Sequence, residues 1–392
     1  MAPSRNESAR PSEPDFIQPE PPKPHPSFIQ VAKPYVFEHT IQQCLAAVAV
    51  NSSREDNMRI QGVTWIDNVR KALRLPVRTF NTACVYYHKF RLTHNDNEYN
   101  YVDAAAAALF TACKIEDTLK KSREILCASY NLKLSAAEYA SPDDPLFDTL
   151  ARGVIGLERL MLEASGFDFR NRHPQKLLVK LAKHYAVQKE SDLAIVAYCM
   201  SLDLNRTFSL LKQTTATMAF ACLELTARLL DDRLEEVGSG GDYGTWKTTR
   251  EEIMETMLDL LDLYTHHRAN TAVGPRFPIE AFLAVRIPLN QEADTKRLPR
   301  YTNWVDKGTL HTGANGLKNG RESSTKDKEK DKDVFPPNAL TPISAIGEKP
   351  KQSERGRDGT VRFMLDPERA YSERATVAGY FKVEVEEFEM DD

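Results

Sequence analysis

The chain has 392 residues, of which 41% are hydrophobic, and a net charge of −4 at neutral pH. A charge this close to zero does not favour a nucleic-acid binder. No run of about eighteen apolar residues occurs, so no membrane span is expected. The first residues lack an apolar segment behind a basic start, which argues against a secretory signal. Six cysteines stand singly in helical patterns, as free thiols of a reducing compartment do.

The N-terminal region divides into a proline-rich segment and a helix. Residues 1–34 contain many prolines and few apolar side chains, a composition that favours extended, solvated conformers, so this segment is predicted to be disordered. From residue 36 to residue 50 an apolar helical pattern appears, with Phe37, Ile41 and Leu45 near one face. A separate N-terminal helix is therefore expected before the main body.

Between residues 58 and 268 the apolar residues recur with a period near 3.6, which predicts an all-helical body. One stretch, residues 104–113, is apolar on every side and rich in alanine, so other helices must enclose it. Gly166 is expected to end a helix in the left-handed conformation. The predicted helices of the first half span residues 58–73, 76–90, a segment ending at Glu116, 122–130 and 145–165.

A second, weaker copy of this pattern follows the first. Residues 216–228 are again small and apolar, as residues 104–113 are in the first half. An internal duplication into two five-helix units explains this repetition better than one large bundle does. In the second half, helices are predicted at residues 174–185, 191–208, 216–228 and 251–267.

The C-terminal part is predicted to contain a tether and a terminal segment. Residues 271–358 include glycine-rich and charged tracts, so a disordered linker is expected. In residues 359–392, the side chains of Val361, Phe363 and Leu365 alternate before an acidic end. This segment is interpreted as a docking element. The alternative is a segment that packs on the body of its own chain.

The sequence offers no arrangement typical of catalysis or metal binding. Paired-cysteine zinc spacing, the His-Glu-x-x-His motif and the Walker loop are all missing from it. Residues 238–241 are glycine-rich, but no strand precedes them, so they are interpreted as a loop. His266 and His267 are adjacent and point to different faces of a helix. We therefore expect no catalytic residue, no cofactor and no metal ion.

Three stretches, residues 75–90, 114–117 and 156–169, make the chain similar to the cyclin family. The resemblance covers residues 36–270 and is specific in the first half, where it is closest to the transcriptional cyclin of the fungal kinase that phosphorylates the RNA polymerase II C-terminal domain. It implies an all-α fold of two tandem five-helix cyclin boxes, with an N-terminal helix and disordered extensions. The implied domains are residues 1–34, 35–170, 171–270, 271–358 and 359–392.

The resemblance also implies a kinase-binding surface. In cyclins a lysine and a glutamate form a pair on this surface, here Lys114 and Glu158, with acidic and apolar neighbours. Without the resemblance, the pair reads as an ordinary surface ion pair of small energetic value. The implied kinase-binding residues are Lys114, Glu116, Asp117, Glu158, Leu162, Phe167 and Phe169. One departure is that Gln61 and Gly62 stand where cell-cycle cyclins place bulky aliphatic residues of a substrate-docking patch.

The function that the resemblance implies is that of a non-catalytic regulatory subunit. Such a subunit binds and activates a cyclin-dependent kinase that phosphorylates the RNA polymerase II tail during elongation, in the nucleus, with or without a third subunit. No direct contact with nucleic acid or with a membrane is expected. Two alternatives stay open: a promoter-binding factor of the transcription factor IIB type, which also contains tandem cyclin boxes, and a kinase-free adaptor.

Overall fold

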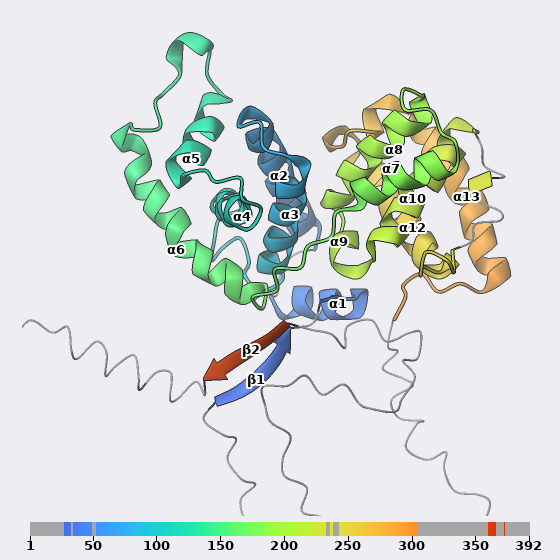
Figure 1. The fold of residues 1–392 in the computed structure, drawn as a ribbon, viewed down its shortest axis with the longest axis horizontal. Coiled ribbons are helices and arrows are strands. Elements are labelled where there is room, and N and C mark those ends of the chain that lie inside the picture. The colour runs from blue at the N-terminus through green and yellow to red at the C-terminus, as the bar shows by residue number, and fades with distance from the viewer. Residues whose placement is uncertain are drawn as a thin grey trace, which may run out of the picture. The chain divides into compact units, whose positions relative to one another are not determined.

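The structure is a computed structural model, and it describes residues 27–32, 34–48, 52–232, 236–237, 243–303, 360–365 and 372. The chain forms two compact units, and the larger one, Val31–Thr360, contains the helices α1 to α13 (Figure 1). The predicted all-α body is confirmed. Among the described residues, no helix is both long and apolar enough to cross a membrane.

The first half forms a five-helix box around α4 (Figure 1). All residues from Ala104 to Cys113 are buried, because α4 packs against the other four helices of the box. Its five alanines in a row allow these neighbours to approach closely. The helices of this first box are α2 (Ser52–Ala72), α3 (Val77–Arg91), α4 (Tyr101–Ile115), α5 (Ser122–Asn131) and α6 (Asp148–Ala164).

The second half repeats this arrangement around α10. Residues 216–227 of α10 are all buried, and the helix packs against α7, α8, α12 and α13. The predicted duplication into two five-helix boxes is therefore seen in the fold. The helices of this second box are α7 (Pro174–His184), α8 (Asp192–Asp203), α10 (Thr215–Leu230), α12 (Arg250–His267) and α13 (Ile279–Lys296), with a short α9 (Ser209–Lys212) between α8 and α10.

The position of α13 corrects the prediction that a disordered linker begins at residue 271. This helix supplies the fifth member of the second box through Phe282, Val285 and Leu289, which are buried against the core. Pro288 lies inside the helix. A proline removes one backbone donor and interrupts the sequence pattern of a helix. The sequence of this segment therefore did not predict a helix. Residues 304–358 of the predicted linker lie outside the described residues.

A second difference is the end of α8, which was predicted at Phe208 and occurs at Asp203. The buried carboxylate of Asp203 accepts hydrogen bonds from the backbone N–H groups of Ala272 and Val273, at 2.8 and 2.9 Å, and from the hydroxyl of Tyr264 at 3.2 Å. Each bond satisfies a donor that burial would otherwise leave unpaired. The helix therefore ends where its last side chain ties it to the segment after α12.

Two short strands lie near the chain ends. Strand β1 (Ser27–Ala32) falls within the predicted disordered segment 1–34, and β2 (Thr360–Leu365) coincides with the predicted alternating residues. The two form a two-stranded sheet. Residues 1–26, and all residues after 365 except Ser372, lie outside the described residues, so the docking role of residues 359–392 stays a prediction.

The predicted N-terminal helix is present as α1 (Glu38–Ala47), and the second box holds it. The backbone N–H of Val36 donates to the carbonyl of Leu211 at 3.0 Å. Glu38 accepts a hydrogen bond from the buried ammonium of Lys212 at 2.9 Å, and Ile41 is fully buried. The segment before the first box is thus fixed mainly by groups from the second.

The structure also explains Gly62 in α2. A Cβ atom at this position would lie 2.2 Å from the hydroxyl oxygen of Tyr87 and 2.3 Å from its ring. Tyr87 is fully buried, and its hydroxyl donates to the carbonyl of Met58 at 3.2 Å. The aromatic ring therefore occupies the space that a bulky aliphatic residue needs, which agrees with the interpretation that no apolar docking patch forms there.

Candidate functional site

The predicted pair of Lys114 and Glu158 is present on the surface of the first box. The two residues are 44 positions apart, and the packing of α4 on α6 brings Lys114 Nζ to 2.8 Å from Glu158 Oε2. The ammonium also lies 4.3 Å above the ring of Phe110. The Lys114 side chain is 46% exposed and that of Glu158 is 19% exposed. The pair is therefore preformed and accessible to a partner.

Glu116 and Asp117 follow α4, but the structure gives them different surroundings. The carboxylate of Glu116 is largely buried and accepts a hydrogen bond from Thr82 Oγ1 at 2.6 Å. It also pairs with Arg78 at 3.6 Å and with His173 Nε2 at 3.5 Å. Asp117 is exposed. Glu116 thus connects α3 and α4 with the start of the second box, and Asp117 alone faces outward.

Asp117 owes its position to the way α4 ends. Its φ of 51° lies in the left-handed region. The N–H of Thr118 donates to the carbonyl of Cys113 at 2.9 Å, and the N–H of Asp117 donates to that of Lys114 at 3.4 Å. These two hydrogen bonds close the end of the helix and satisfy carbonyl groups that have no partner within it. Aspartate tolerates the conformation better than most residues do.

The end of α6 has the same geometry and positions the predicted apolar residues. Gly166, with φ of 67°, ends the helix as predicted, and Phe167 follows with φ of 55°. The N–H of Phe167 donates to the carbonyl of Leu162 at 3.0 Å. Leu162 and Phe167 are partly buried, whereas Phe169 is 51% exposed. Phe169 therefore presents the largest accessible apolar surface of the three.

Asp168 anchors the segment between the two phenylalanines. The buried hydroxyl of Tyr86 donates to the carbonyl of Asp168 at 2.9 Å. The Asp168 carboxylate pairs with Arg170 at 3.0 Å. Burial raises the pKa of this carboxyl, but hydrogen bonds from Arg170 outweigh burial and lower it. The backbone that carries Phe169 is thus held in place before any partner arrives.

Sequence reasoning missed several exposed apolar residues next to this surface. Ile155 is 52% exposed and lies three residues before Glu158 and seven before Leu162, so the three share one face of α6. Leu119, two residues after Asp117, is 73% exposed. A periodic pattern assigns apolar helical residues to the core. Only their exposure, which requires the structure, identifies them as surface residues.

The buried His88 and the adjacent His266 and His267 lie in different surroundings. Nε2 of His88 lies 2.8 Å from the carbonyl of Asn205, and burial lowers the pKa of His88 to about 3. His266 and His267 lie at the end of α12. In the described part of the chain, no three histidine, cysteine, aspartate or glutamate side chains are grouped as a metal site requires. The predicted glycine-rich loop at residues 238–241 lies outside the described residues.

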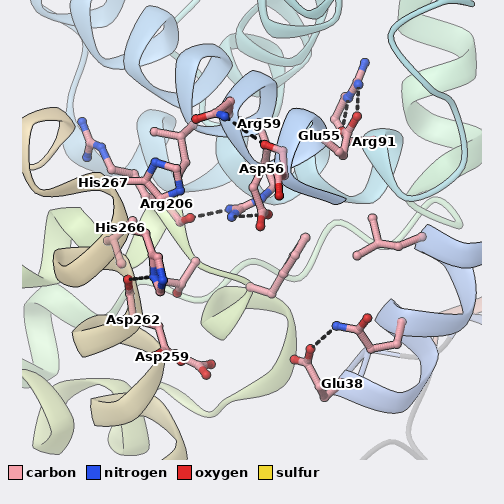
Figure 2. A pocket seen from close by; sticks show the side chains of 18 of the residues that line it. Glu38, Glu55, Asp56, Arg59, Arg91, Arg206, Asp259, Asp262, His266 and His267 are labelled. Carbon is pink, nitrogen blue, oxygen red and sulfur yellow. Dashed lines mark hydrogen bonds and ion pairs between the residues drawn. The ribbon is translucent and has the colours of Figure 1, made fainter. Parts of the chain in front are cut away.

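A cavity of about 580 Å³ lies between the two boxes and α1. Figure 2 shows its first-box side, with Glu55, Arg91 and Arg59, opposite Asp262 and His266 of the second box. These charges are already paired: Arg91 with Glu55 at 2.5 Å, and Arg59 with Asp56 at 3.2 Å. The cavity therefore resembles a polar seam between the boxes rather than a prepared ligand site.

Comparison with known proteins agrees with this fold. The family model described as "Cyclin, N-terminal domain" matches residues 34–170. CTD kinase subunit beta of Schizosaccharomyces pombe is 27% identical over 350 residues, which cover 88% of this chain and 92% of that protein. Cyclin pch1 of the same organism is 30% identical over 180 residues, 44% of this chain and 50% of that protein.

A chain in the crystal structure of the yeast RNA Pol II CTD kinase CTDK-1 complex has a similar fold. The TM-score is 0.60 at 17% sequence identity, and the match covers 88% of this chain and 98% of that chain. At this identity the likeness concerns the fold alone. It extends over both boxes, whereas the family model stops at residue 170.

Proposed function

We propose that the chain is a member of the cyclin family and the non-catalytic regulatory subunit of a kinase that phosphorylates the RNA polymerase II C-terminal domain. It binds and activates a cyclin-dependent kinase catalytic subunit. The observation that carries this proposal is the preformed Lys114–Glu158 pair at 2.8 Å on the surface of the first box. Support for the polymerase tail as substrate comes from the relative named CTD kinase subunit beta.

The proposed kinase-binding surface has the composition of a protein interface. Phe169 and Ile155 supply exposed apolar area, and Lys114, Asp117 and Glu158 supply charge beside it. Interfaces of this kind concentrate their affinity in a few desolvated anchors, and polar groups at the rim set orientation. Glu116 supports this surface from behind, because its carboxylate holds Thr82 and Arg78 of α3.

Activation then follows from differential binding. A kinase needs its Lys–Glu pair and its metal-binding aspartate aligned for phosphoryl transfer. A rigid surface that contacts the mobile kinase helix only in its active position shifts the kinase population toward that state. The first box suits this role because α4 is buried on all sides and cannot yield to the partner. We further propose that the complex acts in the nucleus during elongation, contacts no nucleic acid through this chain, and accommodates a third subunit.

The test of this function is a reconstitution. The purified chain alone is expected to transfer no phosphate, whereas its addition to the cyclin-dependent kinase that co-purifies with it should stimulate phosphorylation of heptad-repeat peptides. The measurement is the rate of phosphate incorporation with each protein alone and with both. Phosphorylation by the isolated chain, or no stimulation of the bound kinase, would contradict the proposal.

The charged pair is tested by a double-mutant cycle. Lys114→Glu and Glu158→Lys should each weaken kinase binding, because each variant places two like charges side by side at positions 114 and 158. The double swap should recover part of the loss, with a coupling energy of about 1 kcal/mol. Recovery is incomplete because a glutamate at position 114 loses the contact with Phe110. If the double variant binds the kinase no better than the single variant with the lower affinity, the two residues do not act as a pair.

A further inference from the structure

The helix α8 has an apolar side that the chain does not cover. One side packs on α10 through Leu193, Val196 and Met200, which are buried. On the other side, Ile195 is 42% exposed and Tyr198 is 37% exposed. A helix that is apolar all round is normally enclosed on all sides. The outer side of α8 is therefore apolar although no other part of the described chain covers it.

The exposed residues of α8 form a continuous seam. The seam follows the pattern i, i+3, i+4, i+7 over two turns and consists of Ile195, Tyr198, Cys199 and Leu202. Cys199 and Leu202 are partly exposed. This spacing is the one with which helices pack against one another along a line. The seam is thus suited to a helix from a partner.

The neighbouring helix α7 carries unpaired positive charge. Lys176, Lys180 and Lys183 are all exposed and lie on one face at spacings of four and three residues. Within the described part of the chain, none of the three forms an ion pair or hydrogen bond. Like charges at a spacing of four residues repel one another and destabilise a helix. The arrangement therefore weakens α7 slightly in the free chain.

The seam and the lysines lie on two neighbouring helices of the second box. α7 and α8 pack against each other, and both pack on α10, so their outward faces point away from that helix (Figure 1). Val179, which is 47% exposed, adds apolar surface on α7. This surface belongs to the second box, whereas the proposed kinase-binding residues belong to the first.

We propose that the outer face of α7 and α8 is a second protein-docking surface, and that its partner is an acidic amphipathic helix. The apolar side of that helix packs along Ile195, Tyr198 and Leu202, and its acidic flank pairs with the lysines of α7. A ligand that offered only phosphate groups would use the lysines but leave the apolar seam exposed. The seam favours a helix, and the lysines determine the sign of its charge.

The test uses the full chain and two designed helical peptides of about three heptads. Both peptides carry the same leucine seam, but one has glutamate on its flanks and the other lysine. By fluorescence anisotropy at physiological salt, the glutamate peptide should bind at least tenfold more tightly than the lysine peptide. Equal binding of the two would overturn the charge assignment. No binding of the glutamate peptide would overturn the docking surface.

Matched variants locate the binding site. Ile195→Asp should weaken binding of the glutamate peptide at least tenfold, whereas Leu283→Asp on α13, at an equal exposure of 42%, should leave it unchanged. A triple reversal of the α7 lysines to glutamate should also weaken it tenfold. The charge-matched control is a triple reversal of the exposed residues Lys133, Lys247 and Arg276, which have no ion-pair partner in the described structure.

The remaining outcomes also decide the question. If a phosphorylated heptad peptide binds through the α7 lysines and Ile195→Asp has no effect, the surface recognises phosphate and the proposal is wrong. If the two control variants lose as much affinity as the targeted ones, the peptide binds elsewhere and the proposal is again wrong. Kinase stimulation should be unchanged in Ile195→Asp, which separates this surface from the proposed function.

Discussion

Replacing Lys212 with methionine is expected to lower the free energy of unfolding by about 3–5 kcal/mol, because it leaves buried carboxylates without their cation. Lys212 Nζ lies 2.9 Å from Glu38, 2.8 Å from Glu255 and 2.6 Å from Asp259. The lysine side chain is 2% exposed. Methionine preserves most of the volume of the lysine, so the loss reflects charge rather than a cavity.

The effect has a structural consequence beyond the second box. Glu38 belongs to α1 and Asp259 to α12, so Lys212 joins the N-terminal helix to the second box. Arg300 also pairs with Asp259, at 2.9 Å, and this pair does not depend on Lys212. Glu38 and Glu255 then carry most of the uncompensated charge. We expect α1 to become accessible to proteases before the rest of the body unfolds.

The pH dependence distinguishes this mechanism from a packing defect. Burial alone lowers the pKa of Lys212, but Asp259, Glu255 and Glu38 outweigh it and raise the pKa above its ordinary value. A raised lysine pKa adds stability that is complete below about pH 10 and is lost only as the pH rises further. The wild-type contribution is therefore constant near neutrality. The deficit of Lys212→Met should therefore narrow only as the pH rises above about 10.

The measurement is urea unfolding of both proteins at several pH values. Lys247→Met is the matched control, because Lys247 is exposed and has no ion-pair partner in the described structure. It should change the unfolding free energy by less than about 0.5 kcal/mol. A Lys212→Met deficit that stays constant even above about pH 10 would show that the carboxylates are not the cause.

The helical body was predictable because its signals are local. Apolar periodicity, Pro76 before α3, Ser191 as the cap of α8 and Gly166 after α6 all act within one or two turns. The fifth helix of the second box was not predictable in this way. Pro288 interrupts its pattern, and its packing on α12 and α10 stabilises it. The Lys212 cluster was also beyond prediction, since Glu38, Lys212 and the neighbouring Glu255 and Asp259 come from three distant parts of the sequence.

The candidate site was predictable in part. Lys114 and Glu158 followed from the resemblance, and the structure shows them in contact. Glu116 was predicted as a surface contact, but its carboxylate faces Thr82 and His173. The direction in which a side chain points after a helix end depends on the left-handed turn that follows. No periodicity describes that turn.

Phe169→Ala is expected to weaken kinase binding by about 2 kcal/mol, or roughly 30-fold in dissociation constant. Phe169 is 51% exposed in the free chain, so its ring is available to fill a pocket on the partner. Buried aromatic anchors contribute more to affinity than charges at the rim. The change should therefore exceed that of Lys114→Glu, although no charge is altered.

The stability of the free chain separates this effect from misfolding. Because half of the ring is already in water, Phe169→Ala should change the unfolding free energy by less than about 1 kcal/mol. Phe167→Ala should differ, because Phe167 is partly buried and its φ of 55° fixes the end of α6. It should lower both stability and kinase affinity.

Leu283→Ala on α13 is the matched control for this prediction, since Leu283 is 42% exposed and lies in the other box. Its kinase affinity should equal that of the wild type, measured by titration of the chain into labelled kinase. Wild-type affinity in a folded Phe169→Ala variant would mean that the kinase contacts a different surface. The first-box assignment would then fail, because Phe169 is the most exposed of its predicted apolar residues and follows Asp168, which Tyr86 and Arg170 hold in place.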